Sequence, residues 1–89
     1  MGNEKLHPTK DVVSRRVGDE IVLINLQSDE MYSLNRTGAR AWELLGEGHD
    51  SETIEATLSD EFGIDREEAQ RELDTLLDDL AREQLVERS

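Results

Sequence analysis

The stretch that decides the fold is Glu30–Leu45, which reads EMYSLNRTGARAWELL. In its first part the side chains alternate between two faces, with Tyr32 and Leu34 on the same one. This period of two predicts a short strand with one face on a core. In its second part the period changes to that of a helix, so the sequence predicts a strand that leads directly into a helix.

The predicted helix after this strand has Thr37 as its N-cap, because a threonine hydroxyl there accepts a hydrogen bond from a free backbone N–H. The apolar residues that follow have the three-to-four spacing of one buried helical face. These residues are Ala39, Ala41, Trp42, Leu44 and Leu45.

Composition limits the classes of protein to consider. With 89 residues the chain has room for one domain and one modest core. Its 22 acidic and 10 basic residues give a formal net charge of −12, which repels nucleic-acid phosphates and anionic membranes. Absence of cysteine excludes disulfides and thiolate zinc sites. The first residues lack the apolar core typical of a signal peptide and no apolar run has the length of a membrane span, so we expect a soluble cytoplasmic protein.

The first half of the chain predicts a small antiparallel sheet. Residues 1–10 are polar and without periodicity and are expected to form a flexible lead-in to a single domain, residues 11–89. A strand over Val12–Val17 is followed by Gly18-Asp19, a tight turn of type II′, or of type I with a bulge, rather than type I′. The next strand, Glu20–Leu26, is apolar on both faces and is therefore expected at the centre of the sheet.

The predicted sheet is a meander of three strands, because a short polar turn, Gln27–Asp29, leads into the strand at 30–34. Its two edge strands differ in charge. The first carries Arg15 and Arg16, and charged side chains protect a sheet edge from further pairing. The third, Met31–Leu34, is uncharged. Its open edge is therefore the more receptive one.

Two further helices are predicted in the second half. Asp50 or Ser51 caps the first, which runs to about residue 61 and ends before Gly63. Asp65 caps the second, with Glu68 in a capping-box position. Their apolar faces consist of Ile54, Leu58 and Phe62 in the first and Ala69, Leu73, Leu76, Leu77 and Leu80 in the second, with Leu85 and Val86 packing back onto the core.

No catalytic or metal-binding pattern is present. The run His49-Asp50-Ser51 contains the residue types of a hydrolase triad, but neighbours in sequence do not reach triad geometry. The acidic run from Asp60 to Glu68 has apolar residues where a calcium loop needs ligands. We therefore expect no enzyme activity, no metal and no cofactor.

Three strands followed by three helices, the last two joined by a short turn, predict an α+β winged helix-turn-helix fold. That fold often binds DNA through its third helix. Here that helix is acidic, so DNA binding is disfavoured. Its charged residues are Glu67, Glu68, Glu72, Asp74, Asp78 and Asp79 against Arg66, Arg71 and Arg82.

The sequence resembles the PqqD-like proteins, which are recognition elements for the precursors of ribosomally made, modified peptides. The motifs that carry the resemblance are VLINL at 22–26, YSLN at 32–35, TGARAWELL at 37–45 and the late leucine helix ending in LVE at 85–87. The chain departs from the pyrroloquinoline-quinone member at Gly46-Glu47-Gly48 and at Gln84. It is more similar to the free-standing proteins of lasso peptide pathways.

The resemblance implies a binding site. In the family, the leader segment of a precursor adds as an antiparallel strand to the third strand, in a groove closed by the third helix. This implies a pairing edge and a helical wall with an acidic residue at each end. The implied peptide-binding residues are Met31, Tyr32, Ser33 and Leu34 of the strand and Asp65, Ala69, Glu72, Leu73, Leu76 and Asp79 of the helix.

An alternative role for part of this set is core packing. Leu34, Leu73 and Leu76 fit a core as well as a binding surface, and Met31 and Ser33 contribute mainly backbone if Tyr32 and Leu34 point inward. The acidic helix implies a leader that is neutral or basic in its bound segment.

The resemblance implies a non-catalytic adaptor that presents its precursor to a leader protease and an ATP-dependent cyclase. Two alternatives stay open: a peptide chaperone of pyrroloquinoline quinone biosynthesis, and a winged-helix regulator that binds or mimics DNA. No nucleic-acid or membrane partner is expected. We expect a monomer, with a dimer paired through the open strand edge as the alternative.

Overall fold

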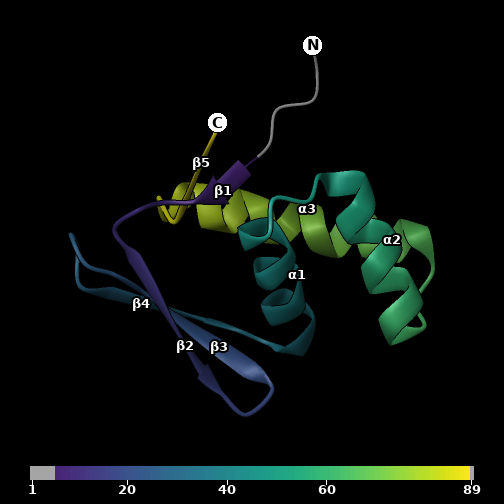
Figure 1. The fold of residues 1–89 in the computed structure, drawn as a ribbon, viewed down its shortest axis with the longest axis horizontal. Coiled ribbons are helices and arrows are strands. Elements are labelled where there is room, and N and C mark those ends of the chain that lie inside the picture. The colour runs from purple at the N-terminus through teal and green to yellow at the C-terminus, as the bar shows by residue number, and fades with distance from the viewer. Residues whose placement is uncertain (1–5, 89) are drawn as a thin grey trace.

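The computed structural model describes residues 6–88. Along this described part of the chain, four strands precede three helices, and one short strand follows them (Figure 1). The elements are β1 (Leu6–Pro8), β2 (Val12–Val17), β3 (Glu20–Asn25), β4 (Glu30–Leu34), α1 (Arg36–Gly46), α2 (Ser51–Phe62), α3 (Arg66–Arg82) and β5 (Val86–Arg88). This order confirms the predicted α+β class.

β3 is the central strand of an antiparallel sheet in the order β2-β3-β4, as its two apolar faces predict. Ile21 and Leu23 are buried beneath the helices, whereas Val22 and Ile24 on the other face are half-buried. The predicted strand extended to Leu26. β3 ends one residue earlier because the chain turns there, which leaves Leu26 exposed.

Two turns set the register of the sheet. Gly18 has a φ of 64° and Asp19 has no positive φ, which excludes type I′ because that turn needs both. In the second turn, Oδ1 of the buried Asn25 accepts hydrogen bonds from the backbone N–H groups of Gln27 and Ser28, at 2.9 and 3.4 Å. This side-chain turn starts β4 in a fixed position opposite β3.

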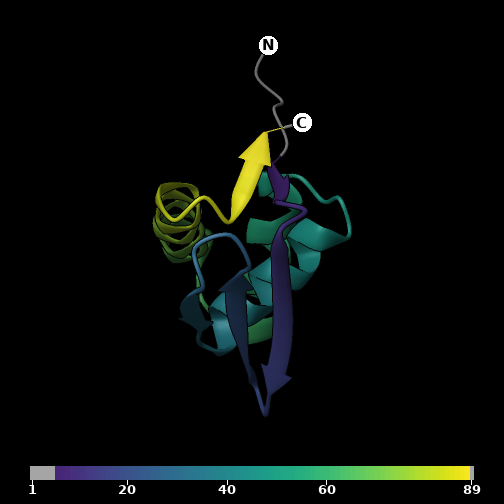
Figure 2. The same ribbon diagram turned by 90° about the vertical axis from the view of Figure 1, so that its left-hand side faces the viewer.

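The helices cover one face of this sheet, and Figure 2 shows β2 and β3 in front of them. The buried apolar faces of α1, α2 and α3 follow the predicted pattern, although Phe62, Leu76 and Leu77 are only half-buried. The largest side chains that are almost completely buried in the core are Leu23, Ile54, Leu58, Leu73, Leu80 and Leu85. Ion pairs link the layers at their margins. Arg16 pairs with Glu43 of α1, and Arg40 of α1 pairs with Glu61 of α2 at 2.9 Å.

The cap of α1 differs from the prediction. Asn35, rather than Thr37, is the N-cap, and its Oδ1 accepts a hydrogen bond from the N–H of Gly38 at 2.9 Å. A Cβ at Gly38 would lie 3.3 Å from that oxygen, so the glycine leaves room for the cap. Because β4 ends at Leu34, the helix begins at Arg36, two residues earlier than a cap at Thr37 allows. α3 has its predicted cap, Asp65, and of the two candidates for α2, Asp50 is the cap.

This cap makes a testable prediction about stability. We expect Asn35→Ala to lower the free energy of unfolding by about 1 kcal/mol, because the N–H of Gly38 loses its acceptor. Thr37→Ala is the matched control and should change it by less than about half that amount. Urea denaturation followed by circular dichroism measures both, and an equal loss from the two variants would contradict the assignment of the cap.

Part of the predicted lead-in is a strand. β1 pairs antiparallel with β5, so that the two ends of the described chain lie side by side (Figure 1). Thr9 extends this contact, with its N–H donating to the carbonyl oxygen of Leu85 at 3.0 Å. The buried side chains of Leu85 and Val86 hold the C-terminal segment on the core, and its backbone then needs partners. The rest of the predicted lead-in, residues 1–5, lies outside the described residues.

Candidate functional site

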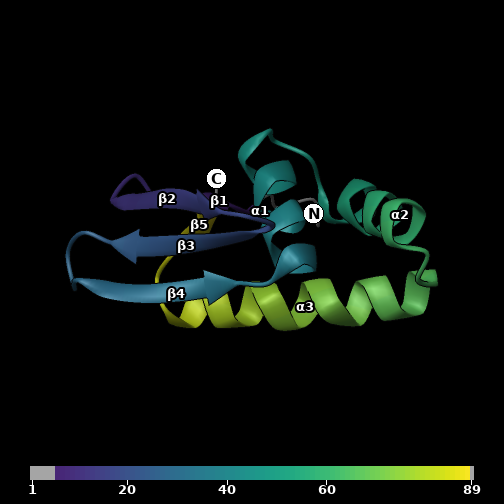
Figure 3. The same ribbon diagram turned by 90° about the horizontal axis from the view of Figure 1, so that it is seen from below.

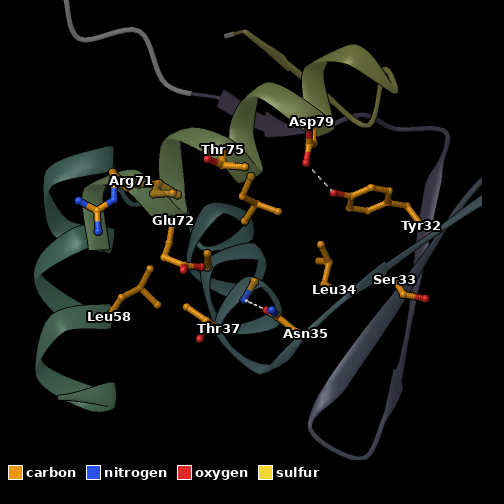
Figure 4. Close-up of a pocket in the computed structure, with 14 residues that line it drawn as sticks. Tyr32, Ser33, Leu34, Asn35, Thr37, Leu58, Arg71, Glu72, Thr75 and Asp79 are labelled. Atoms are coloured by element: carbon orange, nitrogen blue, oxygen red, sulfur yellow. Dashed lines mark hydrogen bonds between the residues drawn. The ribbon is translucent and has the colours of Figure 1, made fainter. Parts of the chain in front are cut away.

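A groove lies between β4 and α3, with a volume of about 340 Å³ (Figure 4). Figure 3 shows α3 running beside β4, on the side away from β3. The groove is lined by Tyr32, Ser33, Leu34, Asn35, Thr37, Gly38, Ala41, Leu58, Arg71, Glu72, Leu73, Thr75, Leu76 and Asp79. A strand edge and a helix therefore form its two walls.

The hydrogen-bonding direction of each strand follows from the turn between β2 and β3. The two-residue turn makes Val17 and Glu20 a hydrogen-bonded pair, and such pairs alternate along an antiparallel ladder. Even-numbered residues of β3 therefore bond to β2. Leu26, whose N–H donates to the carbonyl oxygen of Asp11 at 2.9 Å, continues this pattern. The odd-numbered residues of β3 are left to bond β4.

The open edge of β4 is formed by two residues. Tyr32 and Leu34 lie opposite the odd-numbered residues of β3 and use their backbone groups in the ladder. Met31 and Ser33 alternate with them, so their N–H and C=O groups point away from β3, toward the open edge. This edge has no strand partner among residues 6–88.

The side chain of Tyr32 links the two walls of the groove. Its hydroxyl donates a hydrogen bond to Oδ2 of Asp79 on α3 at 3.1 Å (Figure 4). Burial raises the pKa of Tyr32, and the hydrogen bond to Asp79 raises it further. The phenol therefore stays protonated and able to donate. Arg82 approaches the other oxygen of Asp79 at 3.4 Å.

The wall formed by α3 combines an apolar base with polar margins. Leu73 is buried at the base and Leu76 is half-buried above it. Arg71, Glu72 and Thr75 are exposed along the rim. Such a wall can take apolar side chains into the groove and meet polar or charged groups at its opening.

Seven of the ten residues implied from the sequence line this groove. They are Tyr32, Ser33, Leu34, Glu72, Leu73, Leu76 and Asp79. Met31 has its side chain on the opposite face of the sheet, although its backbone lies on the open edge. Ala69 is completely buried in the core, and Asp65 caps α3 by accepting the N–H of Glu68 at 2.8 Å. Ala69 and Asp65 are therefore not among the residues that line the groove.

Seven further lining residues were not predicted from the sequence. Arg71 and Thr75 precede Asp79 at intervals of four, a spacing that places them on one face of a helix, so this signal was available. The other five come from α1, its N-terminus and α2. They are Asn35, Thr37, Gly38, Ala41 and Leu58. Their place in the groove depends on how the helices pack, and no local sequence pattern predicts that packing.

The described residues offer no metal centre and no membrane span. Among them, no group of three histidine, cysteine, aspartate or glutamate side chains lies close enough to hold a metal ion. No helix between residues 6 and 88 has the length and apolar character needed to cross a bilayer.

Fold and groove together define a small α+β domain of the winged helix-turn-helix class with an open strand edge. Residues 20–86 match the family described as Coenzyme PQQ synthesis protein D (PqqD). The chain therefore belongs to the PqqD family, as the sequence motifs predicted.

Two solved structures are similar over nearly the whole chain. One is described as TbiB1 in complex with the TbiA(beta) leader peptide, with 36% identity, coverage of 91% of this chain and 94% of that chain, and a TM-score of 0.85. The other is a lasso peptide synthetase B1 complexed with the leader peptide, with 22% identity, coverage of 93% and 98%, and a TM-score of 0.85. At that identity the second shows the fold alone. No curated protein matches this chain.

Proposed function

We propose that this protein is a non-catalytic adaptor of lasso peptide biosynthesis. It binds the leader segment of a ribosomally made precursor peptide and presents that precursor, in the cytoplasm, to a leader protease and an ATP-dependent cyclase. Family membership supports this proposal, as does the similarity, at 36% identity, to a protein whose structure is described with a bound leader peptide.

The observation that carries the proposal is the open edge of β4 beside the groove. Met31 and Ser33 direct unpaired backbone groups toward the edge, and an extended peptide can satisfy them as an added antiparallel strand. Alternate side chains of such a strand face the same way, so every second leader residue would enter the groove between Leu34 and Leu76. Backbone bonds supply affinity, and the groove supplies specificity.

Peptide binding in pyrroloquinoline quinone biosynthesis is the second candidate, because the description of the matching family names the synthesis of that coenzyme. The same edge and groove would serve there. Binding to the leader of a lasso precursor or to a pyrroloquinoline quinone precursor separates the two candidates. A DNA-binding function receives no support from the acidic α3 or from the net charge of −12.

The test of the proposal is a fluorescence-anisotropy titration with a labelled leader peptide from the precursor encoded beside this protein. A scrambled peptide of the same composition is the control. We expect saturable binding of the true leader alone. Equal binding of the two peptides, or no binding of either, would contradict the proposed function.

Salt dependence makes a further prediction. Glu72 and Asp79 line the groove against one cation, Arg71, so a leader that is basic in its bound segment is attracted to it. We expect the leader's Kd to rise about three- to tenfold between about 50 and 500 mM salt, as screening weakens this attraction. Glu72→Gln should reduce the slope. A Kd that does not change with salt would instead mean that backbone pairing and apolar contacts dominate.

A further inference from the structure

The sheet has a second face, opposite the helices, which we call the outer sheet face. Registers of β2, β3 and β4 place one set of alternate residues on it. These are Val13, Arg15, Val17, Glu20, Val22, Ile24, Met31 and Ser33. Figure 2 looks onto β2 and β3 with the helices behind them, so no helix of the described chain covers this face.

Exposed apolar side chains gather on this face. Four large hydrophobic residues are exposed among the described ones, and three of them lie here: Val13 at 44%, Val17 at 57% and Met31 at 68%. The fourth, Leu26, lies in the turn at one end of the same sheet. Val13 and Met31 flank the half-buried Ile24 in one row across the three strands, so these three side chains form a patch, and Val17 lies two rows further along β2. Contiguous exposed patches of this kind mark interaction surfaces.

Charge on this face differs from that of the whole protein. Arg15 and Glu20 are its only charged residues, so the face is neutral in a chain of net charge −12. Arg15 lies in the middle row and forms no ion pair with a described residue. Both ends of the sheet are acidic, because Asp19 in the first turn is followed by Glu20 and Asp29 in the second turn is followed by Glu30. The pattern is an apolar patch with a central cation and acidic ends.

We infer that the outer sheet face is the docking surface for the leader protease that cleaves the bound precursor, an inference that rests on the proposed function. The complementary surface on that enzyme is apolar, with a carboxylate facing Arg15 and basic residues facing the two acidic ends. A second copy of this chain is a poor match, because it brings a further net charge of −12 and acidic ends of its own. The groove thus holds the leader while the opposite face holds the enzyme.

The experiment separates these two surfaces with variants on β2, which lies across the sheet from the groove. Val13→Glu places a charge in the apolar patch, and Arg15→Glu reverses its central cation. Ala56→Glu adds the same charge at an exposed position on α2 and is the control. Three quantities are measured on the full-length protein: leader affinity by anisotropy, the rate of precursor cleavage by the leader protease at limiting adaptor, and the sedimentation coefficient.

We expect both β2 variants to bind the leader within about twofold of the parent while cleavage falls at least about tenfold, which corresponds to about 1.4 kcal/mol of lost docking. Ala56→Glu should change neither quantity. Unchanged cleavage with Val13→Glu and Arg15→Glu would overturn the inference, and so would a parent that sediments as a dimer which these variants dissociate. If the parent does not bind the leader, the proposed function itself fails, together with this inference.

Discussion

Replacing Ser33 with proline should weaken leader binding at least about tenfold, or about 1.4 kcal/mol. Proline removes the N–H that Ser33 directs to the open edge and places its ring where the added strand would lie. The ladder to β3 keeps its bonds, because Tyr32 and Leu34 form them. Edge strands accept proline where the N–H faces outward, so the fold should survive.

Ser33→Ala is the matched control for this prediction. It removes the hydroxyl and keeps the backbone N–H, so leader affinity should stay within about twofold of the parent. Anisotropy titration measures both variants, and circular dichroism checks that each is folded. Leader binding by Ser33→Pro with the parent's Kd would mean that the leader does not pair with β4 at this position.

Leu76→Ala should also reduce leader affinity by about tenfold, because it removes a half-buried apolar side chain that lines the groove. Its neighbour Leu77 is half-buried as well but does not line the groove. Leu77→Ala is therefore a matched control for the loss of packing.

Both leucine variants should lower the free energy of unfolding by about 1–2 kcal/mol, less than a fully buried leucine costs. Only Leu76→Ala should change the Kd for the leader. Urea denaturation and anisotropy together test this pair. An equal loss of affinity in the two variants would show that α3 acts through stability alone, without contacting the leader.

Much of the fold could be predicted because local chemistry determines it. Gly18 permits the tight turn that pairs β2 with β3, and Gly63, with a φ of 68°, ends α2 in the left-handed conformation that favours glycine. Asp65 marks the start of α3. In each case one residue type satisfies a local backbone requirement, so the position of the turn or helix end can be predicted from that residue.

Features that depend on distant partners could not be predicted. Residues 6–8 have no periodicity. They form β1 because their backbone groups pair with those of β5, which lies at the other end of the chain. The choice of Asn35 over Thr37 as the cap depends on where β4 ends. Both residue types are good caps, so propensity alone does not separate them.

The candidate site divides in the same way. The uncharged edge of β4 and the acidic face of α3 are visible in the sequence, and the family resemblance connects them. Contributions from Leu58 and Ala41 to the groove require α1 and α2 to pack beside α3, which only the assembled core provides. Ala69 is the converse case, since its helical spacing fits the groove wall but its side chain is completely buried.

Backbone amide hydrogen exchange, measured by NMR with and without the leader peptide, tests strand addition to β4 most directly. The N–H groups of Met31 and Ser33 should exchange at least about tenfold more slowly in the complex, because the leader backbone accepts them. Ser14 and Arg16, whose N–H groups face the other open edge on β2 by the same alternation, should be unchanged. Saturable leader binding that leaves Met31 and Ser33 unprotected, or that protects Ser14 and Arg16 instead, would contradict the account.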